Sequence, residues 1–144
     1  MSDLNEVLKF LKEGIAKFRK AEIMQFQDII KSNWQPQKEV LGFVGVYAIF
    51  EKNKGLIYIG SAGKGGHHIK YRMADLFYFG SKKFKHTLTE KFLTTLGRFK
   101  TIDEVRSFYF QKCYIKVVET KNIRQARILE EVLIYLYNPK YNQE

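Results

Sequence analysis

Residues 43–61 read FVGVYAIFEKNKGLIYIGS, and this stretch decides the fold. It contains two β-rich runs, 43–50 and 56–61, separated by EKNKG, a short polar sequence that ends in glycine. Two such runs joined by a short turn predict a β-hairpin. The hairpin places Tyr47 on its first strand close to Tyr58 on its second.

The sequence before the hairpin has the spacing of helices. Its first apolar residues recur at helical intervals, with Ser2 or Asp3 available as N-cap: Leu4, Val7, Leu8, Leu11, Ile15 and Phe18. A second apolar set between residues 23 and 34 either continues this helix or follows a bend, and Pro36 ends it. Residues 1–40 are nearly balanced in charge, so we expect a helical extension that packs on the rest of the chain or on a second copy.

Helical and β-rich segments alternate after the hairpin. We expect helices over 69–79 and 88–96, a turn of helix that begins at Thr101, a strand over 108–119, and a final helix that Asn122 caps and Pro139 ends. Thr87 and Glu90 have the spacing of a capping box. This order predicts an α+β fold: a small three-stranded antiparallel sheet flanked by helices, with an extension over 1–40 and a domain over 41–144.

Composition narrows the class of protein. The chain has 144 residues, of which 45% are hydrophobic and 15% aromatic, enough to bury one core. Its single cysteine, Cys113, excludes a disulfide framework and a zinc site built from cysteines, and favours a reducing, cytoplasmic location. No run of about 18 apolar residues predicts a membrane span, and the first ten residues do not resemble a secretory signal.

The positive charge is concentrated in one part of the chain. The formal net charge is +10, and residues 41–100 alone hold 11 basic and 3 acidic residues. Concentrated positive charge favours a polyanionic partner, because each phosphate contact releases counterions. A solvated lysine-rich face that maintains solubility is the equally open alternative from charge alone.

Several residues suited to phosphate chemistry follow the hairpin tyrosines. Arg72 is a planar five-donor cation, Glu130 is a hard oxygen ligand for Mg²⁺ or Mn²⁺, and Asn142 can close a turn. Each also has an ordinary structural interpretation. The tyrosines can be core residues of strands, Arg72 a solvated helix residue, and Glu130 half of an ion pair with Arg127. No single residue decides between these interpretations.

Taken in order, these residues resemble the motif set of the GIY-YIG nuclease family. The chain has GVY at 45–47 and YIG at 58–60, then a helical arginine and the C-terminal stretch LEEVLIYLYNPKYN at 129–142, where Glu130 precedes Asn142 by twelve residues. The resemblance covers roughly residues 43–142. Arg72 lies further from Tyr58 than the family pattern has it, and the inserted residues 63–68 can absorb the difference.

The resemblance implies a divalent-metal-dependent endonuclease that hydrolyses DNA phosphodiester bonds. Glu130 would hold Mg²⁺ or Mn²⁺, with Glu131 as the first substitute, and Arg72 would stabilise charge on the phosphoryl oxygens. Tyr47 would act as general base on the attacking water, while Tyr58 orients phosphate or water.

Further roles follow from the same resemblance. A free tyrosine has a pKa near ~10, so a general base at position 47 needs a cationic neighbour, which Lys64, Lys70 or His86 could supply. His86 matches the second histidine of the homing enzymes, whereas Leu76 stands where many members carry a histidine or tyrosine. Asn142 would fix the glutamate or close the site by hydrogen bonds.

Basic residues around the glycine-rich loop are the expected DNA contacts. They are Lys64, His67, His68, Lys70, Lys82, Lys83 and Lys85. A zinc site at the two adjacent histidines is disfavoured, because neighbours on a helix do not share a face and no third ligand lies nearby.

Two other classes of function remain open from the sequence. One is a nucleic-acid-binding module with a vestigial nuclease site, which the complete set of key residues argues against. The other is a structural or protein-interaction domain that assembles through the amphipathic N-terminal helix. The expected partners are DNA and, through that helix, a second copy of the chain, with no membrane.

Overall fold

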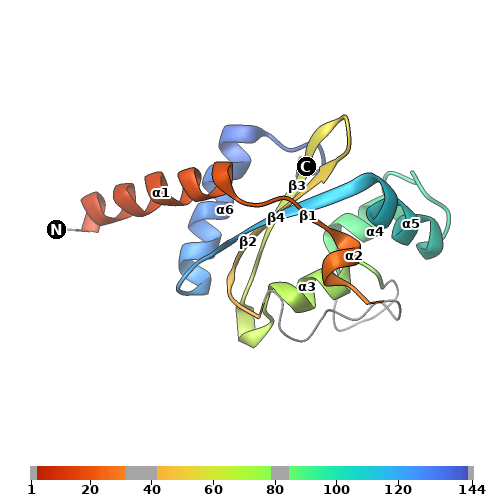
Figure 1. Ribbon diagram of the computed structural model, residues 1–144, viewed down its shortest axis with the longest axis horizontal. Coiled ribbons are helices and arrows are strands. Elements are labelled where there is room, and N and C mark those ends of the chain that lie inside the picture. Colours follow the sequence, from red (N-terminus) through yellow and green to blue (C-terminus); the bar gives the residue numbers. More distant parts are fainter. Residues whose placement is uncertain (1–2, 32–41, 79–84, 143–144) are drawn as a thin grey trace.

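The computed structural model describes residues 3–31, 42–78 and 85–142. Its centre is a four-stranded antiparallel sheet in the order β1-β4-β2-β3, formed by Met24–Gln25, Cys113–Glu119, Gly45–Glu51 and Gly55–Ala62 (Figure 1). Helices cover both faces of the sheet. The predicted α+β fold class is thus confirmed, with four strands in place of three.

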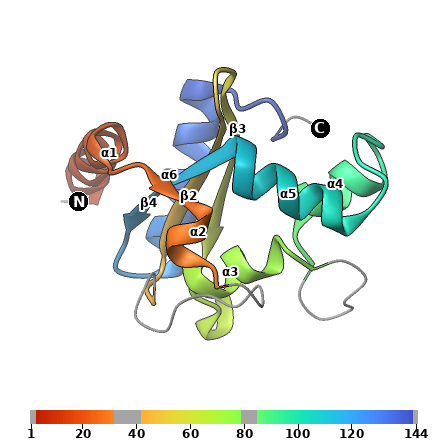
Figure 2. The same ribbon diagram turned by 45° about the vertical axis from the view of Figure 1, so that its right-hand side comes forward.

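The helices divide between the two faces (Figure 2). One face carries α1 (Asp3–Lys20) and α6 (Ile123–Tyr137), which pack on a small core that includes Val46, Ala48 and Ile59. The other face carries α2 (Phe26–Ile29), α3 (Ile69–Asp75), α4 (Thr87–Leu93) and α5 (Ile102–Lys112), and the 3₁₀ turn η1 (Lys64–Gly66) precedes α3. Tyr47 and Tyr58 both belong to this second, larger core.

The β2–β3 hairpin forms as predicted. Its turn uses Asn53 and Gly55 at positive φ angles of 66° and 93°, a conformation that asparagine and glycine adopt at low cost. A register shift between Ile49 and Phe50 marks a bulge in β2. The hairpin forms the centre and one edge of the sheet.

The predicted strand over 108–119 is wrong in its first part. Residues 108–112 complete α5, and β4 begins only at Cys113. Val105, Phe108 and Tyr109 lie at helical spacing and are buried on the sheet. Packing of this aromatic face against the core therefore overrides the high β-propensity of the aromatic residues.

The segment before the hairpin joins the same sheet and core. β1 pairs with β4 through Met24 and Gln25, and Phe26 and Ile29 of α2 are buried in the core that holds Tyr47. The predicted boundary between 1–40 and 41–144 falls on residues outside the described ranges, as do Trp34 and Pro36. That boundary stays a prediction.

Helix α1 buries only part of its apolar stripe. Phe18 is buried and Gly14 packs on Leu129 of α6, whereas Leu4 and Leu8 are 67% and 47% exposed. In Figure 1 the N-terminal half of α1 extends away from the sheet. Among the described residues, no helix combines the length and apolar character that crossing a bilayer requires.

The helix caps test the local predictions. Thr101 accepts from the backbone N–H of Glu104 at 3.2 Å, and Asn122 accepts from that of Gln125 at 2.9 Å, as predicted. The predicted capping box at Thr87 is wrong, because His86 is the N-cap of α4 and accepts from the Leu88 N–H. In α6, Ala126, Leu129 and Leu133 are buried, whereas Leu136 near its end is 52% exposed.

Candidate active site

Two glycines of the motifs leave room for the Tyr47 ring and for the neighbouring strand β4. Tyr47 pairs with Gly60 across the hairpin, and a Cβ at position 60 would lie 2.5 Å from the Tyr47 ring. A Cβ at Gly45 would collide with the carbonyl oxygen of Val118. The rings of Tyr47 and Tyr58 lie with their centroids 6.3 Å apart. The first and last glycines of the GVY and YIG motifs are thus steric requirements of this sheet.

His86 binds the hydroxyl of Tyr47. Its Nε2 lies 2.7 Å from Tyr47 Oη, and its Nδ1 accepts the Leu88 N–H at 3.1 Å. Burial, and then the positive charge of Arg72, hold the pKa of His86 well below its ordinary value, so the ring is neutral. A neutral imidazole carries one hydrogen. Because Nδ1 is used as an acceptor, that hydrogen sits on Nε2 and is donated to Tyr47.

Arg72, and not His86, is therefore the cation beside Tyr47. Burial raises the pKa of Tyr47 well above its ordinary value, and the neighbouring Tyr58 raises it further, while Arg72 opposes this shift by charge and a hydrogen bond. Burial alone would lower the pKa of Arg72, but its interactions with Tyr47 and Asp75 raise it overall. Tyr47 is accordingly a neutral phenol at rest, surrounded by two donors that would stabilise its phenolate.

Arg72 is held in place from two sides. Its Nη1 donates to Asp75 Oδ2 on α3 at 3.0 Å and to the carbonyl oxygen of Lys85 at 3.0 Å. The second bond connects α3 to the segment that carries His86. The guanidinium is therefore fixed between the Asp75 carboxylate and the Lys85 carbonyl oxygen, beside Tyr47.

Glu130 faces the sheet from α6, whereas Glu131 is exposed. Ser61, at the end of β3, donates its hydroxyl to Glu130 Oε1 at 2.8 Å. Burial raises the pKa of Glu130, and the hydrogen bond from Ser61 opposes the shift. Burial also raises the pKa of Tyr58, and the charge of Glu130 is the next cause of that shift. Glu130 is thus electrostatically coupled to the tyrosine pair.

Asn142 stabilises β3 at its outer edge. Its side chain accepts from the Ile59 N–H at 2.7 Å and donates to the Ile59 carbonyl at 2.8 Å. The edge strand β3 thereby satisfies a backbone donor and acceptor between the motif residues Tyr58 and Gly60. Asn142 thus contacts the backbone of β3, and its predicted role at the site stays a prediction.

A basic pocket of about 370 Å³ opens beside these residues. Its lining comprises Ser61, Ala62, Gly63, Lys64, His67, Arg72, Lys85, Ile123 and Arg127. Three of the predicted DNA contacts, Lys64, His67 and Lys85, therefore lie in its wall. The pocket also joins the end of β3, which carries Ser61, to Arg72.

The remaining predicted contacts lie elsewhere. Lys70 stacks over Tyr71 with its Nζ 5.0 Å from the ring centroid, and His68 stacks on the same ring at 6.3 Å. Lys82 and Lys83 lie outside the described residues. No group of three His, Cys, Asp or Glu side chains suited to a metal occurs in the described part of the chain.

Three residues of this region were missed by sequence reasoning. Ser61 and Arg127 were quoted there without a site role, and Asp75 was not singled out. The signal for Asp75 is its position three residues after Arg72 on a helix, which places the two on one face. Ser61 gave no local signal, since its contact with Glu130 spans 69 positions.

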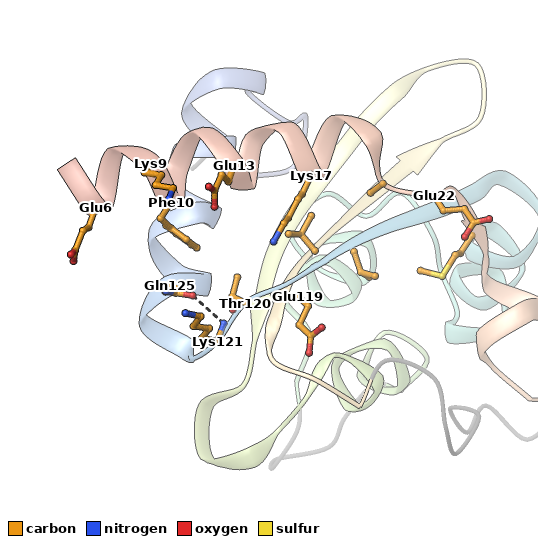
Figure 3. A pocket seen from close by; sticks show the side chains of 14 residues that line it. Glu6, Lys9, Phe10, Glu13, Lys17, Glu22, Glu119, Thr120, Lys121 and Gln125 are labelled. Atoms are coloured by element: carbon orange, nitrogen blue, oxygen red, sulfur yellow. Dashed lines mark hydrogen bonds between the residues drawn. The ribbon is translucent and has the colours of Figure 1, made fainter. Parts of the chain in front are cut away.

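A larger hollow lies between α1 and β4, away from the motif residues (Figure 3). Its walls carry side chains of both signs, among them Glu13, Lys17, Glu119 and Lys121. Neither the motif tyrosines nor Arg72 or Glu130 lines it. Mixed charge does not favour a phosphate there, so the smaller basic pocket is the candidate site.

The chain resembles known proteins in its fold. No protein-family model and no curated protein matches the chain. The chain is similar to two crystal structures of the GIY-YIG N-terminal endonuclease domain of UvrC from Thermotoga maritima, both point mutants bound to the catalytic divalent cation. The identities are 24% and 23%, each match covers 80% of this chain and 100% of the other, and both TM-scores are 0.45. These domains carry the name of the family that the sequence motifs resemble.

Proposed function

We propose that the chain is a divalent-metal-dependent endonuclease that hydrolyses DNA phosphodiester bonds. One observation carries the proposal: a hydrogen-bonded group of Tyr47, His86 and Arg72 lies beside a basic pocket whose Ser61 binds the carboxylate of Glu130. Residues from β2, β3, α3 and α6 contribute to this arrangement. It combines a phenol that can accept a proton once it is ionised, a fixed cation and an acidic oxygen ligand, which are the groups that phosphoryl transfer requires.

The donor set fits a hydrated Mg²⁺ or Mn²⁺ ion. Mg²⁺ retains several waters and commonly takes one or two carboxylates together with substrate phosphate oxygens. Glu130 supplies one such carboxylate, and Ser61 fixes the orientation of that carboxylate from its Oε1 side. When bound, the ion would polarise the phosphate and neutralise the leaving oxygen.

The side chains of the site have separate roles in the proposed reaction. Arg72, held at Nη1 by Asp75 and the Lys85 carbonyl, presents its other N–H groups to the phosphoryl oxygens. Tyr47 takes a proton from the attacking water once its own hydroxyl has lost a proton to solvent. The Nε2–H of His86 remains donated to Tyr47 Oη and stabilises the phenolate. Tyr58 orients phosphate or water.

DNA is the proposed substrate because the pocket wall is basic. Lys64, Lys85 and Arg127 line the pocket together with Arg72. Such a wall attracts phosphates over distances of about a Debye length. We propose a cytoplasmic location on the basis of the single cysteine, Cys113, which is unpaired and buried.

A survey of substrates tests this function. Purified chain is incubated with supercoiled, branched and linear DNA, with Mg²⁺ or with EDTA. We expect nicked or linear products that depend on Mg²⁺. DNA binding without cleavage under every metal condition would favour the vestigial binding module instead.

We also propose that a second copy pairs with α1 in antiparallel orientation. Exposed Leu4, Val7 and Leu8 leave an apolar stripe on this helix. Its first turn is acidic and its last turn is basic, so antiparallel pairing opposes unlike charges. Sedimentation should show a dimer that Leu8→Ser weakens and Lys12→Ser leaves intact; a wild-type monomer at high concentration would contradict this.

A further inference from the structure

A buried carboxylate, that of Asp75, lies behind the pocket and contacts two of the residues that line it. Asp75, the last residue of α3, is 6% exposed. Its Oδ2 accepts from Arg72 Nη1 at 3.0 Å and contacts His67 Nε2 at 2.8 Å. Carboxylates are rarely buried this deeply unless they are paired. Both partners of Asp75 line the pocket, so the carboxylate is connected to the site from behind its wall.

The bond to Asp75 fixes the orientation of Arg72. A guanidinium has five N–H donors in one plane, so two acceptors at Nη1 define how that plane lies. These acceptors are Asp75 Oδ2 and the Lys85 carbonyl oxygen, each at 3.0 Å. The remaining N–H groups are then directed toward Tyr47 and toward the space where a phosphate would bind.

Asp75 is one of few acidic residues in the basic part of the chain. Residues 41–100 contain only three acids, Glu51, Asp75 and Glu90. Glu51 pairs with Arg98, and Glu90 lies 3.7 Å from Lys85. Asp75 is thus the acid that contacts Arg72 directly, at a place where a negative charge weakens the attraction for DNA.

We propose that Asp75 is a positioning residue, which directs Arg72 at the phosphoryl oxygens and holds His67 in the pocket wall. The inference rests on the proposed nuclease function and deepens it. It has an unusual consequence, because the charge and the geometry of Asp75 act in opposite directions. Removing the negative charge strengthens DNA binding, whereas releasing Arg72 from its orientation slows cleavage.

Asp75→Asn tests this opposition. The variant keeps the size of the side chain but removes the charge, and with it the charge-assisted bond that holds Arg72. We expect single-turnover cleavage at saturating DNA to fall on the order of 10²-fold, as for a misplaced catalytic group. The Kd for DNA should stay equal or become tighter. Asp103→Asn is the matched control, since Asp103 also pairs with an arginine three residues away but is exposed on α5.

A double-mutant cycle separates positioning from general support of the fold. If Asp75 acts through Arg72, Asp75→Asn should add little to the loss caused by Arg72→Ala, less than about threefold. Independent losses that multiply would overturn the proposal. So would a parallel loss of DNA affinity and cleavage in Asp75→Asn, because a structural defect affects both.

The ¹⁵N NMR signal of the Arg72 guanidinium gives a readout that needs no activity. We expect a well-ordered side chain in the wild type and an averaged one in Asp75→Asn. If the wild type cleaves no DNA, the proposed function fails, and this signal still tests Asp75. If Asp75→Asn does not fold, Asp75→Glu retains the charge but displaces the carboxylate, and should bind DNA normally while cleaving slowly. An Arg72 signal unchanged in the folded variants would overturn the proposal.

Discussion

The two hydrogen bonds of His86 can be removed one at a time. Nδ1 accepts from Leu88 N–H at 3.1 Å, and Nε2 lies 2.7 Å from Tyr47 Oη. In His86→Asn the amide oxygen takes the place of Nδ1 and keeps the cap of α4, but the side chain is too short to reach Tyr47. In His86→Gln the amide nitrogen takes the place of Nε2 and donates to Tyr47, while the cap is lost.

The two variants should be equally destabilised but differ in cleavage. Each loses one bond at a fully buried site, so the free energy of unfolding should fall by about 1–3 kcal/mol in both. Only His86→Asn loses the donor to the Tyr47 phenolate, which should lower single-turnover cleavage on the order of 10²–10³-fold. His86→Gln should cleave within about tenfold of the wild type, a loss of less than ~1.4 kcal/mol.

Denaturant unfolding, single-turnover cleavage and ¹⁵N NMR of the imidazole measure these quantities. The NMR spectrum should show the hydrogen of the neutral ring on Nε2. A hydrogen on Nδ1, or a His86→Gln variant as inactive as His86→Asn, would refute the donor role. His86 would then be a proton acceptor for Tyr47.

Further outcomes follow from the same geometry. The pKa of Tyr47 is raised well above its ordinary value, so its phenolate fraction grows tenfold per pH unit near neutrality. The logarithm of the cleavage rate should therefore rise with a slope near +1 across neutral pH, and a flat profile would exclude Tyr47 as base. Lys64→Ala and Lys85→Ala should each reduce the dependence of DNA affinity on salt concentration by about one unit of slope, while the turnover of bound DNA is nearly unchanged. Lys121→Ala, in the other hollow, is the control, and an unchanged slope in the first two variants would mean that these lysines do not contact DNA. Gly60→Ala places a Cβ 2.5 Å from the Tyr47 ring and should lower the free energy of unfolding by about 1–3 kcal/mol. Gly42→Ala meets only the end of the Lys70 side chain at 3.9 Å and should change it little, so equal effects of the two variants in denaturant unfolding would contradict the steric account.

Local signals predicted the parts of the fold that local interactions decide. The hairpin around EKNKG, the cap at Thr101 and the cap at Asn122 all follow from residues within a few positions of one another. The aromatic run at 108–112 was misassigned because its propensity favours a strand while its packing on the sheet favours a helix. Strand β1 has only two residues, too few for an alternating pattern to reveal.

The site residues that the motif spacing selected stay predictions, and the structure adds contacts that the spacing did not indicate. The motif spacing identified Tyr47, Tyr58, Arg72 and Glu130, whose interactions the structure describes, but their roles stay predictions. Spacing gave no indication that His86 is neutral, because its burial and its bond to Tyr47 depend on contacts across 39 positions. The spacing selected Asn142 but did not indicate its bond to Ile59, because this bond forms only when the C-terminal stretch returns to β3.

The metal-dependent role of Glu130 is the central claim, and its neighbour provides the control. Single-turnover cleavage of DNA is measured during a Mg²⁺ titration for Glu130→Gln and Glu131→Gln, together with DNA affinity in EDTA. Both variants remove one negative charge from α6, but only Glu130 faces Ser61, since Glu131 is exposed. We predict that Glu130→Gln abolishes cleavage at every Mg²⁺ concentration while DNA binding persists, and that Glu131→Gln cleaves like the wild type. Normal Mg²⁺-dependent cleavage by Glu130→Gln, or its loss in Glu131→Gln alone, would contradict the assignment.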